Sequence, residues 1–198
     1  MNDDLQPDAV ALAGHSGDEA TVRAALVADD PRLRAVALGA LARLGALGPD
    51  DLIRALADPD PGVRRRAAEE AGRTSGRPVG LVAVLEDPDP GVVEAAAWAC
   101  GERRPVEPGI VAALSTVAGR HDDPLCREAA VAALGAIGDD DGLAAILAAT
   151  TDKPAVRRRA IIALAPFGGE DVDAALQRGL EDRDRQVRQA AEDLLGDG

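Results

Sequence analysis

Paired aspartates are the residues of this sequence best suited to chemistry. DPDPGVRRRAA occupies residues 58–68, DPDPGVVEAAA occupies residues 87–97, and DDDG follows at residues 139–142. Two neighbouring carboxylates can hold a metal ion or divide the roles of general acid and general base. An aspartate can also accept hydrogen bonds from the free N–H groups at the start of a helix, which is a purely structural role.

Histidine and cysteine add little to a catalytic interpretation. His15 and His121 lie in expected loops, and Cys100 and Cys126 lie at apolar positions of expected helices. A thiol at such a position is typical of a small buried apolar residue. Phosphate-binding glycine loops, nucleophile elbows and metal-spaced Cys/His sets are absent from the sequence. We therefore expect a protein that is not an enzyme, with no catalytic residue, no metal ligand and no cofactor.

The aspartate pairs belong to a repeat with a period near 30 residues. Aligning the sequence on the apolar residue that follows each aspartate–proline turn gives spacings of 30, 29, 34, 30 and 31 residues. A fixed period of this size is typical of stacked helical repeats. The six anchor residues are Leu33, Val63, Val92, Cys126, Val156 and Val187.

An aspartate stands three residues before five of these anchors, and a proline usually follows it. Aspartate is a preferred N-cap and proline is tolerated at the first helical position, so the pair predicts a helix start. A metal or catalytic pair would be expected once rather than in every unit. The sequence therefore favours capping by Asp30, Asp60, Asp89, Asp123 and Asp184. The cluster at 139–141 lies where a B helix is expected to begin and lacks the alternating ligands and the later glutamate of an EF-hand loop, so it is interpreted as a cap and not as a calcium site.

Each repeat is expected to contain two antiparallel helices, called here the A helix and the B helix. In the A helix, the anchor and the residues four, seven and eight positions later share one face, the spacing of a buried stripe. The small residue nine positions after the anchor is expected to end the helix or allow a close turn. The B helices are expected at residues 50–57, 79–86, 109–118, 142–150 and 171–180.

An arginine follows five of the six anchors directly: Arg34, Arg64, Arg127, Arg157 and Arg188. Because each lies beside the capping aspartates, we expect an Asp–Arg ladder that holds successive repeats in register. In the third repeat Val93 takes the place of the arginine.

The segments DPDPGVRRRAAEEAG and DDPLCREAAVAALGAIGDDDGLAAIL resemble the short HEAT-like repeats of the phycobilisome-lyase type. The resemblance implies an all-α fold, a right-handed α-solenoid of about six stacked antiparallel helix pairs, with A helices outside and B helices on the concave face. One domain over residues 1–198 is expected, with units at about 5–28, 29–57, 58–86, 87–118, 122–150 and 152–180 and a C-terminal cap helix at 182–196. A di-iron hydroxylase of this fold uses His–Glu pairs as ligands, and this sequence contains none.

Composition narrows the range of partners. The formal net charge is −13, and 46% of the residues are apolar although there is one Trp, one Phe and no Tyr. Such a charge disfavours binding to nucleic acid, because the phosphates would be repelled.

The sequence also bears on cellular location. The uncharged runs are shorter than the roughly 20 residues that a membrane span needs, and the first residues lack the apolar core of a secretory signal. We expect a cytoplasmic protein, with a monomer favoured; the acidity fits a halophilic source, or a GC-rich genome that prefers Arg and Ala.

The function expected from these features is a non-catalytic scaffold or adaptor that binds another protein, for example within a signalling or regulatory complex. The resemblance leaves open a lyase-like subunit that handles a tetrapyrrole, and a nucleic-acid-binding HEAT-like protein is a further alternative. Trp98 is expected on the outer face, either as an exposed anchor or packed over its neighbours. Candidate contacts are Trp98, Ile162, Arg158 and Arg159 on the outer face, and Arg54, Thr116 and Arg178 on the concave face.

Overall fold

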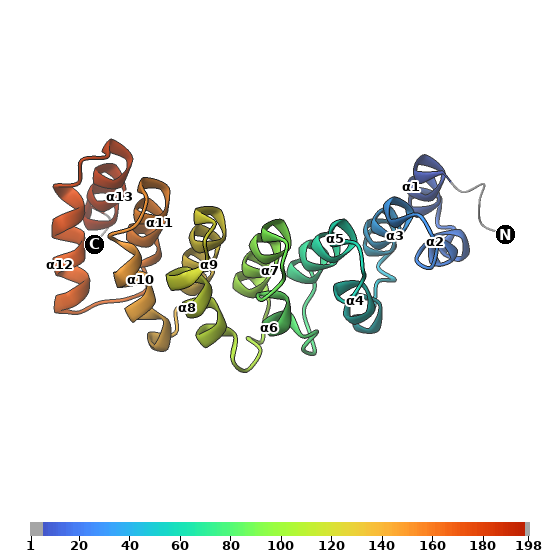
Figure 1. Ribbon diagram of the computed structural model, residues 1–198, viewed down its shortest axis with the longest axis horizontal. Helices are drawn as coiled ribbons and strands as arrows, with labels where there is room; N and C mark the ends of the chain where they lie inside the picture. Colours follow the sequence, from blue (N-terminus) through green and yellow to red (C-terminus); the bar gives the residue numbers. More distant parts are fainter. Residues whose placement is uncertain (1–5, 197–198) are drawn as a thin grey trace. The chain divides into compact units, whose positions relative to one another are not determined.

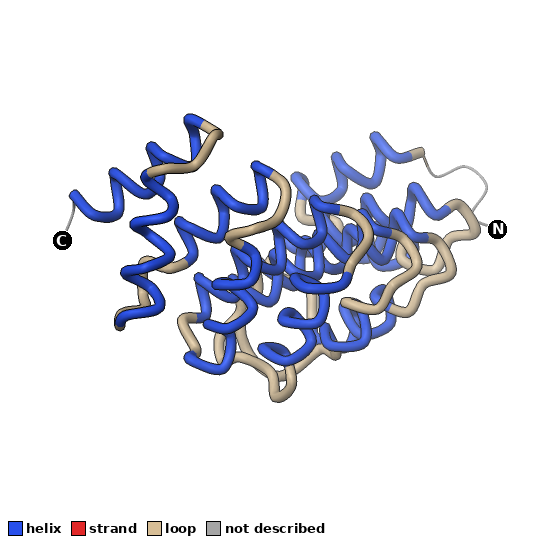
Figure 2. The backbone as a smooth tube through the Cα atoms, turned by 60° about the vertical axis from the view of Figure 1, so that its left-hand side comes forward, coloured by secondary structure: helices blue, strands red, loops and turns tan. Residues whose placement is uncertain are grey.

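The computed structural model describes residues 6–196 as helices joined by loops, with no strand in that range (Figure 2). The chain forms two compact units. Unit 1 comprises the residues up to Ala99 together with Arg103–Pro105, and unit 2 comprises Cys100–Glu102 together with the residues from Val106 onward. Each unit is described by itself below.

Unit 1 is built from A and B helices in alternation. The A helices are α1 (Pro7–Ser16), α3 (Pro31–Leu44), α5 (Pro61–Gly72) and α7 (Pro90–Glu102), whose last turn belongs to unit 2. The B helices are α2 (Glu19–Ala25), α4 (Pro49–Leu56) and the single turn α6 (Leu81–Val84). Helix α3 lies beside α1 on one side and α5 on the other (Figure 1). The B helix expected at 79–86 is shorter than predicted, because α6 covers only Leu81–Val84.

Unit 2 repeats the same arrangement. Its A helices are α9 (Pro124–Ile137), α11 (Pro154–Ala163) and α13 (Arg185–Gly196). Its B helices are α8 (Ile110–Arg120), α10 (Leu143–Ala149) and α12 (Glu170–Leu180), and a short 3₁₀ turn, η1 (Asp140–Gly142), precedes α10. Helix α11 packs between α9 and α13 (Figure 1). The predicted all-α fold of repeated helix pairs is confirmed, and α13 stands alone as the last A helix within the described residues.

The aspartates at the helix starts are caps. The Asp60 carboxylate accepts hydrogen bonds from the N–H groups of Gly62 and Val63, at 2.9 and 3.2 Å. Asp139 accepts from the N–H of Asp141 at 3.0 Å, as expected for the DDD cluster. The same role is played by Asp30, Asp89, Asp123 and Asp184. The structural interpretation of the paired aspartates is thus confirmed at each of these positions.

The small residues nine positions after the anchors end a helix in some repeats, since Gly72 and Gly196 are the last residues of α5 and α13, but in other repeats the helix continues past them. Helix α9 continues through Gly135 to Ile137, and α7 continues through Gly101 to Glu102. A β-carbon added at Gly135 would lie 2.6 Å from the β-carbon of Ala163 on α11. Glycine is needed because it lets the backbones of neighbouring A helices approach closely. The close pairs are Gly14 with Ala40, Gly72 with Ala99, Gly101 with Ala133, and Gly135 with Ala163.

The Asp–Arg ladder is present, although its acceptors are not the capping aspartates. Arg64 donates from Nε and Nη2 to the two carboxylate oxygens of Asp87, at 2.6 and 2.8 Å, in the forked geometry that favours arginine. Its Nη1 also donates to the carbonyl oxygens of Asp58 and Pro59. Each arginine therefore joins the loop before its own helix to the loop before the next A helix. The ladder pairs are Arg34–Asp58, Arg64–Asp87, Arg127–Asp152 and Arg157–Asp182.

Two positions depart from the ladder. Val93 is buried in α7 in place of an arginine, and His121 stands before α9 at the position where the loops before α5, α7 and α13 carry an aspartate. His121 Nδ1 accepts a hydrogen bond from the N–H of Asp123 at 3.1 Å, which is the bond that Asp58 and Asp87 accept in their loops. This histidine therefore keeps the local turn geometry of the aspartate that it replaces.

The ladder predicts a loss of stability in acid. Hydrogen bonds from Arg64 hold the pKa of Asp87 below its ordinary 3.8, and Arg127 and Arg157 do the same for Asp152 and Asp182. A lowered folded-state pKa means that the folded protein binds fewer protons than the unfolded chain. The stabilisation is therefore complete well above pH 3.8 and is lost as the pH falls below it. Urea unfolding followed by circular dichroism between pH 7 and pH 2.5 checks this; an unfolding midpoint unchanged down to pH 2.5 would contradict it.

None of the helices within residues 6–196 has the length and the apolar character that crossing a membrane requires.

Candidate functional site

Trp98 is the most distinctive surface residue of unit 1. It lies on α7, and 39% of its surface is exposed. One edge of the ring covers Gly72 on α5, and the guanidinium carbon of Arg73 lies 5.6 Å from the ring centroid. This is the geometry of a cation–π contact. One edge of Trp98 is thus packed against α5, while the rest of its side chain is partly exposed.

The other residues expected on A helices are found on α11 of unit 2. Ile162 is 44% exposed. Arg158 is half-buried and makes no ion pair among the described residues, whereas Arg159 approaches Glu128 at 3.5 Å. Neither arginine has a carboxylate four residues later on its own helix, where Ile162 and Ala163 stand, and Glu128 lies on α9.

The residues expected on B helices lie on three separate elements. Arg54 is on α4, Thr116 is on α8 and Arg178 is on α12, and all three are exposed. Arg54 pairs with the buried carboxylate of Asp51 at 2.5 Å, and Thr116 donates its hydroxyl hydrogen bond to the Ala112 carbonyl of its own helix. Within each unit, the structure gathers none of these three with another into a common site.

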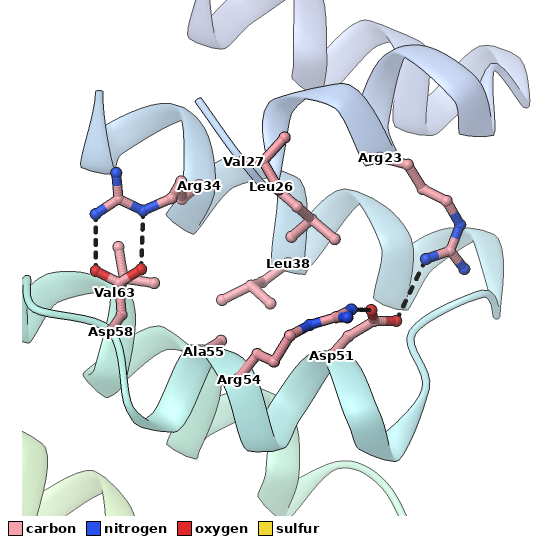
Figure 3. A pocket seen from close by; sticks show the side chains of 10 residues that line it. All are labelled: Arg23, Leu26, Val27, Arg34, Leu38, Asp51, Arg54, Ala55, Asp58 and Val63. Atoms are coloured by element: carbon pink, nitrogen blue, oxygen red, sulfur yellow. Dashed lines mark hydrogen bonds and ion pairs between the residues drawn. The ribbon is translucent and has the colours of Figure 1, made fainter. Parts of the chain in front are cut away.

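A pocket of about 330 Å³ lies between α2, α3 and α4 (Figure 3). Its apolar lining includes Leu26, Val27 and Leu38, and Asp51 accepts from Arg54 and from Arg23 at one end of it. At the other end of the pocket, Arg34 and Asp58 of the ladder form an ion pair with each other at 2.7 Å. Burial raises the pKa of Asp58, but the hydrogen bonds from Arg34 and from the Asp60 N–H outweigh it and leave that pKa lowered. Because each carboxylate here has an arginine partner, the charged groups of this pocket are largely neutralised.

A larger pocket, of about 520 Å³, lies between α3 and α5, and we call it the α3/α5 pocket. Arg66 pairs with the buried carboxylate of Glu70 at 2.7 Å, and Arg73 approaches the same carboxylate at 3.4 Å. The guanidinium of Arg66 occupies the space that a side chain at Gly39 would fill. The complete lining is Gly39, Ala42, Arg43, Gly45, Leu47, Arg66, Glu70, Arg73 and Thr74.

A pocket of about 370 Å³ lies between α11 and α13 in unit 2. Ile162, Ala165, Ala190 and Leu194 form its apolar part. Its polar rim is formed by Arg158, Gln186, Gln189 and Asp193.

These last two pockets occur where the Gly–Ala pairing of neighbouring A helices is replaced. Between α3 and α5 the two positions hold Ala42 and Glu70, and between α11 and α13 they hold Ala165 and Leu194. A β-carbon on one helix and a longer side chain on the other prevent the close backbone approach that glycine allows. The two positions that set the helix separation, and so open each pocket, are those seven and nine residues after the anchor.

Sequence reasoning missed Arg43, Arg66, Glu70 and Arg73 as a group. Glu70 is the residue that could have indicated this group, because it is charged at a position, seven residues after the anchor, where the other repeats hold alanine or leucine. Arg43 and Arg73 also share one column, ten residues after their anchors. Arg65 and Arg66 each have a glutamate four residues later, a spacing that favours ion pairs along one helix. Both pairs form, Arg65 with Glu69 at 3.1 Å and Arg66 with Glu70 at 2.7 Å.

Comparisons with known proteins identify the repeat type. Residues 78–154 match the family model of HEAT repeats, and residues 156–182 match the model of the PBS lyase HEAT-like repeat. No curated protein is similar enough in sequence to match the chain.

Solved structures share the fold at low sequence identity. An engineered protein has a TM-score of 0.68 at 22% identity, with 90% of this chain and 97% of that chain covered. A designed armadillo repeat protein in complex with the peptide (KR)4 has a TM-score of 0.68 at 18% identity, with 90% and 98% covered. Human deoxyhypusine hydroxylase has a TM-score of 0.52 at 19% identity, with 98% and 81% covered. The fold is therefore that of the α-solenoid repeat proteins.

Proposed function

The chain is a HEAT-like repeat protein, and from this premise we propose that it is a non-catalytic scaffold that binds another protein. Repeat solenoids present extended surfaces that suit docking, and the designed armadillo neighbour holds a peptide. The observation that carries the proposal is the partly exposed Trp98 with Arg73 over its ring. Tryptophan and arginine are enriched among the residues that dominate binding energy at protein interfaces.

Local packing supports Trp98 as a contact residue. The ring is held between α5 and α7, because Gly72 lets it lie against the helix and Arg73 covers one face. A side chain already fixed in one orientation loses little conformational entropy when a partner binds. The exposed part of the ring is therefore a preorganised apolar contact next to a cation.

The experiment is affinity capture from the source cells at their own salt concentration, with wild type, Trp98→Ala and Leu125→Ala as baits. Leu125 is the matched control, since it is a large apolar residue of α9 that is 55% exposed. We expect a stoichiometric partner whose affinity falls about 30-fold or more on Trp98→Ala, the size of a hot-spot effect of about 2 kcal/mol. Leu125→Ala should retain it.

Helical circular dichroism of each bait must match that of wild type, so that loss of a partner is not loss of the fold. A partner held equally by wild type and Trp98→Ala would remove Trp98 from the interface. No stoichiometric partner for any bait would count against the scaffold itself.

A further inference from the structure

We propose that the α3/α5 pocket and the neighbouring Trp98 bind an acidic peptide segment of a partner protein, with its carboxylates on Arg43, Arg66 and Arg73 and an apolar side chain over Trp98. This deepens the proposed function, on which it rests, by assigning the chemistry of the partner.

The arginines of the pocket differ in how much of their hydrogen-bonding capacity is used. Arg66 and Arg73 share the Glu70 carboxylate, which is buried with 3% of its surface exposed. Arg43 is exposed and makes no ion pair or hydrogen bond among the described residues. Arg66 also approaches the Glu69 carboxylate at 3.5 Å, and Arg73 donates to the Glu69 carbonyl oxygen at 3.3 Å. Each of the three guanidinium groups carries five N–H donors, which together exceed what these acceptors can satisfy. Donors therefore remain for a ligand.

The charge of the pocket is opposite to that of the protein. Three arginines and one glutamate line it, which gives a net charge of +2, while the whole chain carries −13. Including Arg65 and Glu69 at the edge leaves this value unchanged, because those two residues pair with each other at 3.1 Å. A local excess of positive charge on an acidic protein is the complement of a short anionic segment.

Glu70 positions the arginines. A buried carboxylate is costly unless it is paired and hydrogen-bonded, and here two arginines of its own helix provide the pairing. The arginines are in turn held at the pocket, with Arg66 resting over Gly39 and Arg73 reaching Trp98. Guanidinium groups fixed in this way are preorganised to receive carboxylates in the forked geometry.

Arg73 connects the charged and the apolar parts of the surface. It lines the α3/α5 pocket and also lies 5.6 Å from the Trp98 ring. A segment with carboxylates and one leucine-like side chain matches both parts. A long polyanion such as nucleic acid is disfavoured, because beyond the pocket it would meet the strongly acidic remainder of the protein.

The test uses Trp98 as the probe, since it is the only tryptophan and the chain has no tyrosine. A capped peptide with four glutamates around one leucine is titrated at a salt concentration at which the protein shows its full helical signal. A peptide with glutamine in place of glutamate and the basic peptide (Lys-Arg)4 serve as comparison probes. Trp98 fluorescence and calorimetry give the affinities.

Arg43→Glu is the decisive variant, because Arg43 is exposed and makes no hydrogen bond or ion pair among the described residues. Arg120→Glu is its matched control, an exposed arginine at the end of α8 in unit 2. We expect the acidic peptide to change the Trp98 fluorescence, the glutamine peptide to bind at least about 10-fold more weakly, and Arg43→Glu to weaken the acidic peptide at least about 10-fold. Arg120→Glu should leave the affinity within about 2-fold.

Three results would overturn the proposal: no binding of the acidic peptide, equal weakening by Arg43→Glu and Arg120→Glu, or binding of the basic peptide in its place. The capture experiment with Trp98→Ala is independent of these peptides. A partner that requires Trp98 but is indifferent to Arg43→Glu would therefore reject the acidic segment and leave the scaffold function standing.

Discussion

Replacing Arg64 with methionine is expected to lower the free energy of unfolding by about 3–5 kcal/mol, the usual cost of breaking a buried ion pair from one side. Asp87 would keep its negative charge with 8% of its side chain exposed, and it would lose both guanidinium donors of Arg64 and keep the N–H of Asp89. The carbonyl groups of Asp58 and Pro59 would lose their donor as well. For a chain of this length the loss corresponds to a fall of roughly 6–20 °C in Tm.

Arg65→Met is the control for this prediction. Arg65 is the next residue of α5, and it pairs with Glu69 on the surface with 61% of its side chain exposed. Surface pairs of this kind contribute about 0–1 kcal/mol, so the Tm should change by only a few degrees. Thermal and urea unfolding by circular dichroism measure both variants. Similar values for Arg64→Met and Arg65→Met would show that the ladder does not hold the repeats together.

Gly135→Ala is expected to destabilise the protein by about 1–2 kcal/mol, although alanine is the better helix former by about 1 kcal/mol. The new β-carbon would lie 2.6 Å from the β-carbon and 2.7 Å from the α-carbon of Ala163. Because one of these atoms belongs to the backbone, α9 and α11 must move apart and lose packing along their length.

Gly119→Ala tests whether this effect comes from packing. Gly119 is also helical, in α8, and a β-carbon there would meet no atom within 4 Å. Only the helix propensity then acts, so this variant should be stabilised by up to about 1 kcal/mol. Urea unfolding should move the two midpoints in opposite directions. A stabilised Gly135→Ala would mean that the A helices do not depend on close backbone approach.

Most of the fold could be predicted because its signals are local and recur. The aspartate–proline start of α5 and the apolar anchor Val63 appear in the other repeats with small changes, and each copy supports the others. The ladder arginines were found in the same way. Their acceptors were misassigned, because the capping aspartate Asp60 and the ladder aspartate Asp58 are two residues apart and only geometry distinguishes their roles.

The α3/α5 pocket could not be predicted by the same reasoning. Its position depends on how closely two A helices approach, and this distance is set by pairs of residues about 28 positions apart, such as Ala42 and Glu70. Departures from the repeat pattern were more informative than the pattern itself. Trp98 was singled out for that reason, whereas the departure from the repeat pattern at Glu70 was overlooked.

The ladder also bears on how such a chain can change in length. Each ladder repeat supplies one arginine to the next repeat and one aspartate to the previous one, as residues 58–86 do through Arg64 and Asp58. A tandem duplication of this segment would let Arg34 reach the first copy of Asp58, the first Arg64 reach the second Asp58, and the second Arg64 reach Asp87. Deleting the segment would let Arg34 reach Asp87. Recombination between repeats can therefore add or remove a whole unit and leave no ladder arginine or ladder aspartate without a partner.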